Sequence, residues 1–138
     1  SIWYAAVCRA DGGPIAIGSE TSVQDNSILH TKPGSGSINV GRGVTIGHNV
    51  RMGACSIGDD CVIGMGCEIA DGVVVEGGAI VGARAYVEPG TVVKAGHIWT
   101  GHPAQKFRPV SDQERSLFAR GKEVYVAYAA KYLAQTAA

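Results

Sequence analysis

The chain has 138 residues, with twelve Lys and Arg against twelve Asp and Glu, so its formal net charge is zero. The length indicates one domain, and the balanced charge indicates neither a nucleic-acid partner nor an anionic membrane surface. No apolar run approaches the roughly 18 residues of a membrane-spanning helix, so we expect no transmembrane segment.

Residues 1–7 are apolar and strand-like, and the sequence starts without an initiator methionine. An exposed first strand would leave an unpaired edge, so we expect that coils or a leader precede this sequence. Arg9 and Asp11 follow, and alternate residues of a strand project to one side. They could pair across a subunit interface; the alternative is an ordinary surface ion pair.

Gln24 and Asp25 precede His30 by a few residues. An amide and a carboxylate in this position could orient a ligand or a bound water. They could equally cap a turn, because Asp and Asn bond readily to turn backbones. Taken alone, His30 and His48 are each more often solvated than bound to a metal.

An aliphatic residue recurs at every sixth position backwards from Val93 to Ile57, and after one step of five residues the register continues through Met52 to Val40. This period fits neither an amphipathic helix nor an alternating strand, and it indicates a repeat architecture. Small residues two positions earlier, such as Cys61 and Ala79, would alternate with the large ones. The pattern predicts a parallel β-helix with three short strands per coil.

The same register precedes Val40, but Leu29 and Val40 are eleven residues apart, five more than one unit. The excess is a loop at residues 31–37, rich in Gly and Pro. With this loop counted, Gly53 should stack one coil above His30. His48 should lie on a different edge of the prism, so a site that uses both edges needs a second subunit.

Cys55, Cys61 and Cys67 occupy the small inward position of the repeat, and the four cysteines show no CxxC spacing. This favours buried reduced thiols over zinc ligands or disulfides. Reduced thiols point weakly to an intracellular or organellar compartment.

The repeat ends after Trp99, where Gly101, Pro103 and Pro109 break it. Residues 111–114, Ser-Asp-Gln-Glu, form a capping box that predicts a helix. The apolar helix residues should pack on the prism; they are Leu117, Phe118, Val124, Tyr125, Tyr128 and Tyr132. We assign the β-helix to residues 1–104 and the packed C-terminal helix to residues 105–138.

Several motifs together resemble the gamma-class carbonic anhydrase family, and the match runs in order along nearly the whole chain. They are Ser1-Ile2-Trp3-Tyr4, Arg9-Ala10-Asp11, the segment from Val23 to His30, Ile46-Gly47-His48, Ile63-Gly64-Met65-Gly66 and Gly101-His102-Pro103-Ala104. The resemblance implies a left-handed β-helix, a trimer, and zinc sites between subunits. In the family each zinc is held by two histidines of one subunit and one of the next.

In this resemblance His30 matches the first zinc ligand and His48 the ligand donated across the interface. The remaining ligand position is Gly53, which has no side chain to bind a metal. The other matched site residues are the interface pair Arg9 and Asp11, Gln24 and Asp25 near the zinc-bound water, and Tyr125 on the C-terminal helix.

The resemblance leaves three functions open. The favoured one is a mainly structural subunit of a heterotrimer of homologous subunits, as in the domain of mitochondrial complex I on the matrix side of the inner membrane; a bacterial cytoplasmic protein is the alternative. A second is an active carbonic anhydrase, converting carbon dioxide and water to bicarbonate, with zinc only at an interface shared with a three-histidine partner. A third is a hexapeptide-repeat acyltransferase, which shares the fold.

Overall fold

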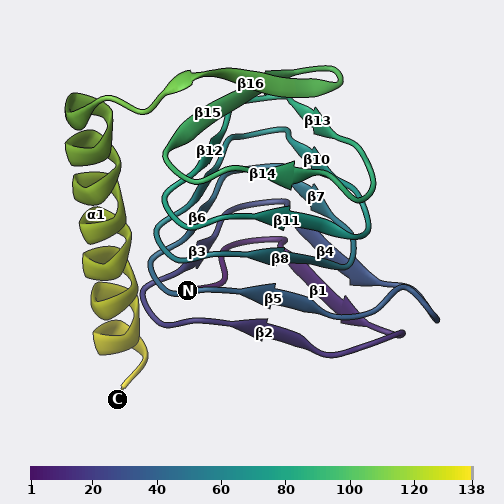
Figure 1. Cartoon of the computed structure of the whole chain (residues 1–138). Helices are drawn as coiled ribbons and strands as arrows, with labels where there is room; N and C mark the ends of the chain where they lie inside the picture. The colour runs from purple at the N-terminus through teal and green to yellow at the C-terminus, as the bar shows by residue number, and fades with distance from the viewer. Residues whose placement is uncertain (138) are drawn as a thin grey trace.

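The structure is a computed structural model and describes residues 1–137. It is a parallel β-helix of three faces with one long helix alongside (Figure 1). The first face is β1-β4-β7-β10-β13, the second β2-β5-β8-β11-β14, and the third β3-β6-β9-β12-β15-β16. From β1 to β15, successive strands of the chain step from one face to the next, so each coil contributes one strand to every face, and β16 adds a second terminal strand to the third. The predicted repeat fold is confirmed.

The strands are short because a corner follows every few residues. Those of the first face are β1 (Val7–Ala10), β4 (Ile28–Thr31), β7 (Arg51–Met52), β10 (Glu68–Ile69) and β13 (Tyr86–Val87). The second face holds β2 (Ile15–Ile17), β5 (Ile38–Val40), β8 (Cys55–Ile57), β11 (Val73–Val75) and β14 (Val92–Val93). The third holds β3 (Ser22–Val23), β6 (Thr45–Ile46), β9 (Val62–Ile63), β12 (Ile80–Val81), β15 (His97–Gly101) and β16 (Ala104–Pro109).

The core is a stack of the aliphatic residues that define the repeat. On the first face Leu29 pairs with Met52, Met52 with Ile69, and Ile69 with Val87, all of them buried. This register confirms that the coil count is correct in spite of the loop at residues 31–37. His30 and Gly53 therefore follow paired residues in consecutive coils.

Cysteines fill the small inward positions, as predicted. All four are free thiols; Cys8 is exposed, and the other three are buried. The Cys61 and Cys67 thiols donate to the carbonyls of Glu76 and Gly82 at 3.1 and 2.9 Å. Burial raises the pKa of Cys55 to about 12 and that of Cys61 to about 11, so these thiols stay protonated.

The β-helix ends in an antiparallel hairpin that the sequence did not predict. β15 pairs with β16, with a register irregularity between Ile98 and Trp99. Gly101 and Pro103 break the repeat as expected, but they do so as the turn of a hairpin. Residues 104–109 are consequently a strand, although we expected residues 105–138 to belong to the helical segment.

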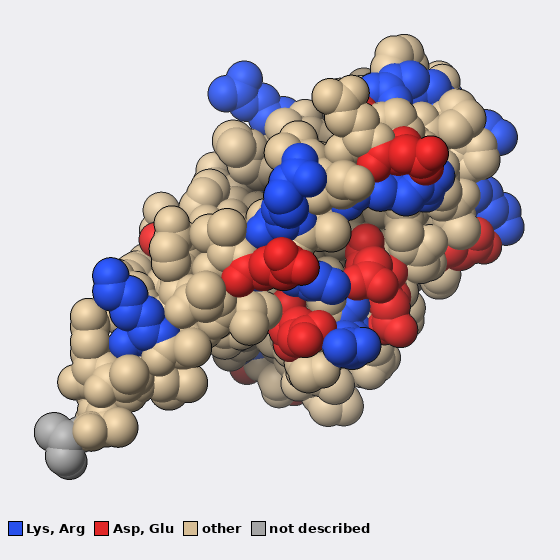
Figure 2. Space-filling model, turned by 90° about the vertical axis from the view of Figure 1, so that its left-hand side faces the viewer, with Lys and Arg blue, Asp and Glu red and all other residues tan. Residues whose placement is uncertain are grey.

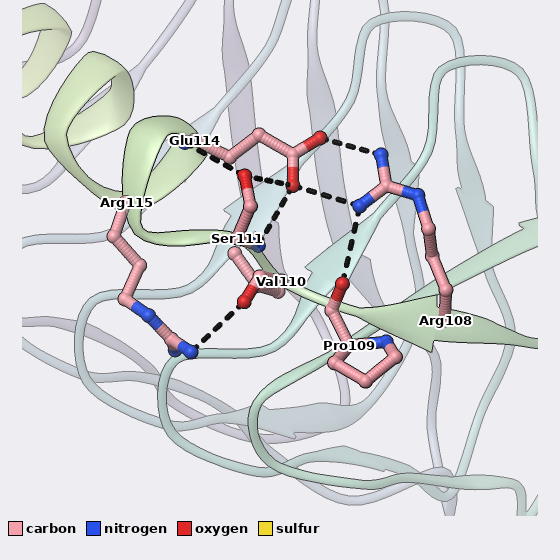
Figure 3. Close-up of polar contacts among 6 residues, drawn as sticks. All are labelled: Arg108, Pro109, Val110, Ser111, Glu114 and Arg115. Carbon is pink, nitrogen blue, oxygen red and sulfur yellow. Dashed lines mark hydrogen bonds and ion pairs between the residues drawn. The ribbon is translucent and has the colours of Figure 1, made fainter.

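Helix α1 (Asp112–Thr136) begins with the predicted capping box. The Ser111 side chain accepts from the backbone N–H of Glu114, whose carboxylate accepts from the Ser111 N–H in return (Figure 3). Arg108 adds two hydrogen bonds to the same carboxylate, which holds the pKa of Glu114 at about 2. No helix within residues 1–137 is long and apolar enough to cross a membrane.

The helix lies against the third face along a narrower stripe than predicted. Phe118, Lys122, Tyr125 and Ala129 are half-buried. The other predicted packing residues, Leu117, Val124, Tyr128 and Tyr132, are 44–56% exposed. The prediction was wrong for Leu117 and Val124, because apolar residues cover a wider arc of the helix than one sheet face can contact. Tyr128 and Tyr132 are half exposed but do contact Trp3.

Candidate functional site

The first half of the candidate site lies at the edge between the first and second faces. His30, on β4, pairs with Arg9 on β1. Asp11 Oδ2 lies 2.8 Å from Arg9 Nε and 3.3 Å from His30 Nε2. Arg9 and Asp11 therefore form an exposed ion pair within the chain, and such a pair contributes only about 0–1 kcal/mol to stability. Through Asp11, the pair also contacts the His30 ring.

Gly53 lies in the coil above His30, and both line one surface cavity of about 320 Å³. The carboxylate of Asp71, from the next coil, also lines this cavity. Asp71 Oδ1 occupies the place that a Cβ on Gly53 would take. The same oxygen accepts a hydrogen bond from the Ala54 N–H at 2.8 Å. At Gly53, where the resemblance implies a zinc ligand, the structure thus has a neighbouring carboxylate beside the backbone.

The same arrangement occurs once more, at a corner far from the histidines. A Cβ on Gly41 would meet the Asp59 carboxylate, and Asp59 Oδ1 accepts from the Arg42 N–H at 2.8 Å. At both corners the aspartate satisfies a backbone donor where the chain leaves the strand ladder. A stacked Gly–Asp pair is therefore a structural feature of corners in this fold and not a metal site in itself.

The second half of the site lies at the edge between the third and first faces. His48 stands in the corner between β6 and β7, and its Nδ1 lies 3.4 Å from Asp25 Oδ1. Gln24 is 5% exposed, and its Nε2 lies 3.4 Å from Ser22 Oγ. Asp25 thus orients the imidazole, and Gln24 is held by its own strand.

Tyr125 of α1 reaches the second half from the helix. It shares a cavity of about 390 Å³ with Asp25, Trp3 and Tyr128. Burial, and then the negative charge of Asp25, raises the pKa of Tyr125. The ring also makes an edge contact with Trp3 at 5.6 Å between centroids. Tyr125 is therefore a neutral phenol beside Asp25.

The predicted site residues lie in two separate groups within the chain. Arg9, Asp11 and His30 are joined at one edge, and Asp25, His48 and Tyr125 at the other. Within residues 1–137 no three His, Cys, Asp or Glu side chains converge to hold a metal. A copy placed edge to edge would bring together only two imidazoles, His30 and His48. The donor set does not fit a catalytic zinc, which takes three protein ligands and a water.

Two features of the site were missed from the sequence. Asp71 was not singled out, although the five-residue step after Met52 brings it above Gly53. The aromatic cluster was predicted only as helix packing, and Trp3 was not assigned to it. Trp3 makes edge contacts with Tyr125, Tyr128 and Tyr132. An aromatic residue at the start of the chain and tyrosines spaced at three and four residues in the helix were the available signal.

The chain is similar to gamma carbonic anhydrases and to hexapeptide-repeat proteins. It is 37% identical over 99% of its length to gamma carbonic anhydrase 1, mitochondrial, of Arabidopsis thaliana, of which it spans 52%. It is 36% identical to Escherichia coli protein YrdA, covering 97% of this chain and 76% of that one.

Among solved structures, a hexapeptide transferase family protein from Anaplasma phagocytophilum superposes with a TM-score of 0.90. The two are 35% identical, over 96% of this chain and 77% of the other. No family model matches the sequence.

Proposed function

Because the chain belongs to the gamma-class carbonic anhydrase family, we propose that it is a mainly structural subunit of a trimer of gamma-carbonic-anhydrase-like chains. The chain spans about half the length of its Arabidopsis relatives. Those relatives carry the word mitochondrial in their names, which supports a mitochondrial location. The matrix side of the inner membrane is what the resemblance implies, and the bacterial relative YrdA supports the alternative of a bacterial cytoplasmic protein. The domain of respiratory complex I implied by the resemblance is the assembly that we favour.

The observation that carries this proposal is the replacement of a ligand by Gly53 and Asp71. Gly53 offers no donor atom, and the Asp71 carboxylate is engaged with the Ala54 N–H. His30 therefore has no second imidazole on its own face. A trimer of this chain alone would contain three incomplete sites, and two imidazoles would have to hold zinc with water.

A second function is supported by the contact between Asp25 and His48. A carboxylate that orients an imidazole is the usual support of a histidine that binds metal. We propose that His48 completes a zinc site in a homologous subunit that carries both histidines of its own. In such a heterotrimer this chain donates one ligand to the anhydrase site of a neighbouring subunit, and its own site stays incomplete.

A hexapeptide-repeat acyltransferase is the third candidate, and the similarity to the Anaplasma protein supports it. That similarity is one of fold and sequence. The joined Arg9, Asp11 and His30 group matches the anhydrase resemblance and is not required by the β-helix itself.

Two substitutions in the native assembly test the proposed role of His48 in a partner's zinc site. His48→Ala should abolish zinc binding at the one site that this chain completes. His30→Ala should leave the zinc content per trimer unchanged, because its own site already lacks a ligand. The measurement is elemental analysis of the trimer purified through a tag on this chain. A loss of zinc in the His30 variant, with His48→Ala unaffected, would contradict the assignment.

A further inference from the structure

A cavity of about 290 Å³ lies between helix α1 and the third face of the β-helix (Figure 1). On the sheet side it is lined by Thr45 of β6, Val62 of β9 and Ile80 of β12, and on the helix side by Phe118 and Lys122. Within residues 1–137 it shares no lining residue with the two cavities of the candidate site. Ligand pockets usually measure about 300–1,000 Å³ and are mostly apolar with a few polar groups, so this cavity suits a small molecule.

The floor of the cavity is a hydrophobic cluster separate from the main core. Val62, Ile80 and Val110 are 8%, 7% and 4% exposed, and Phe118 of α1 packs against them. Val62 and Ile80 are register partners on neighbouring strands, so they form one continuous apolar surface. A polar group buried against this surface would lose its hydrogen bonds to water, so the buried part of a ligand has to be apolar.

Lys122 stands over one side of this floor. Its Nζ lies 3.2 Å from Asp60 Oδ1, and its side chain is only 26% exposed. Its stem lies over Gly43, where a Cβ would be 3.2 Å from Lys122 Cδ. The apolar stem of the lysine is thus packed against the coil, and the ammonium group is held at the cavity.

Arg115 provides a second cation, two turns earlier in the helix. One of its N–H groups donates to the Val110 carbonyl at 2.9 Å (Figure 3). Its Nε is 3.7 Å from the carboxylate of Asp112, whose side chain is fully exposed, so this ion pair is weak. A guanidinium has five N–H donors in a fork that matches a carboxylate, and Arg115 therefore keeps donors for a ligand.

The charged residues of the lining carry a net positive charge. Arg115 and Lys122 are two cations, and Asp60 is the one carboxylate, which leaves a net charge of +1 among the lining residues. A monoanion would neutralise this charge, whereas a cation would be repelled. Figure 2, which views the molecule from the helix side, shows basic and acidic residues interspersed. This surface suits one small anion better than a polyanion, which needs an extended basic patch.

We propose that the cavity binds a small aliphatic monocarboxylate. Its carboxylate contacts Arg115 and Lys122, and its hydrocarbon chain lies on Val62, Ile80 and Phe118. Because such a ligand contacts both the helix and the third face, it stabilises the packing of α1 on the β-helix. The site depends neither on zinc nor on a second subunit.

Titration of the purified chain with sodium hexanoate, followed by the NMR shifts of the backbone amides, tests the proposal. The amides that line the cavity should shift and reach saturation at one ligand per chain, whereas those of the first face should not move. Hexylammonium has the same chain length and the opposite charge, and it should cause no saturable shift.

Two charge variants test the carboxylate contact. Arg115→Gln should lower the affinity for hexanoate at least about tenfold, because it removes a charged hydrogen-bond partner. Arg120→Gln is the matched control, since it makes the same change of charge on the same helix at a residue outside this lining. Its affinity should equal that of the wild type.

Two alanine variants test the place of binding. Ala119 lines the cavity, so Ala119→Trp should fill it and abolish the hexanoate shifts. Ala127→Trp, at an exposed alanine of the same helix outside this lining, should bind as the wild type. Circular dichroism should show equal helix content in all the proteins. The proposal is overturned if hexanoate gives no saturable shift, if hexylammonium binds equally well, if both arginine variants lose the same affinity, or if Ala119→Trp binds as the wild type.

Discussion

Asp71 lies directly above Gly53, with its Oδ1 in the place of the missing Cβ and 2.8 Å from the Ala54 N–H. The pair links two consecutive coils at the corner where the chain takes its single five-residue step. It explains how the fold remains intact at a position where the family resemblance implies a histidine.

Gly53→His should restore the lost ligand at a cost in stability. The new Cβ requires the Asp71 carboxylate to turn away, which removes its hydrogen bond to Ala54, so the free energy of unfolding should fall by about 1–2 kcal/mol. Urea unfolding measures this loss, and zinc content per chain should rise in the assembled protein.

Gly41→Ala is the matched control for this variant. The stack with Asp59 is disturbed there, and the new Cβ also meets backbone atoms of Gly58 and Asp59, so a loss of stability at least as large is expected with no gain of zinc. A Gly53→His protein that binds no more zinc than the Gly41→Ala protein would refute the ligand assignment.

The fold itself was predicted well from the sequence, because one aliphatic residue per six positions is a strong signal that every coil repeats. The helix start at Ser111 was also predictable, since the capping box is local. The hairpin strand at residues 104–109 was not predictable. Its pairing with β15 depends on a turn at Gly101 and Pro103, and these residues are equally compatible with a simple end of the repeat.

The candidate site was predictable only in part. Coil counting located His30 and Gly53 on one face and His48 on a different edge of the prism. The Asp71 contact could not be predicted, because it depends on which rotamer satisfies the Ala54 N–H. Leu117 and Val124 were predicted to pack on the prism but are exposed, since spacing alone does not show how much of an apolar arc one sheet face covers.

Glu114 should make stability depend on pH in the acid range. Its pKa is about 2 in the folded chain, below the ordinary value of about 4.3 for a glutamate. The carboxylate therefore stabilises the fold above about pH 4.3, and this contribution is lost as the pH falls towards 2. Wild type and Glu114→Gln should differ in urea midpoint at pH 7 and converge near pH 2; a constant difference would contradict the assignment.

The buried thiols should be unreactive in the native chain. Protonated thiols are poor nucleophiles, and burial holds the pKa of Cys55 near 12 and that of Cys61 near 11. With an aromatic disulfide reagent at neutral pH, one thiol per chain, Cys8, should react before unfolding and four after it. Rapid reaction of two or more native thiols would show that the coils open readily.

Trp3 should anchor α1 to the prism. It makes edge contacts with three tyrosines of the helix at centroid distances of 5.5–6.5 Å. Each aromatic pair contributes about 0.5–1.5 kcal/mol, so Trp3→Ala should lower the free energy of unfolding by about 2 kcal/mol. Phe107→Ala, at a ring that is 65% exposed, should change it by less than about 0.5 kcal/mol. Equal effects of the two variants would exclude the anchoring role.

The most direct test of the central claim is the zinc content of the purified chain without partner subunits. The chain is loaded with excess zinc, passed through gel filtration and analysed for metal. Because Gly53 supplies no ligand, we predict no zinc that survives the column. Three zinc ions per trimer, together with rapid hydration of carbon dioxide, would contradict the account and make the chain an anhydrase in its own right.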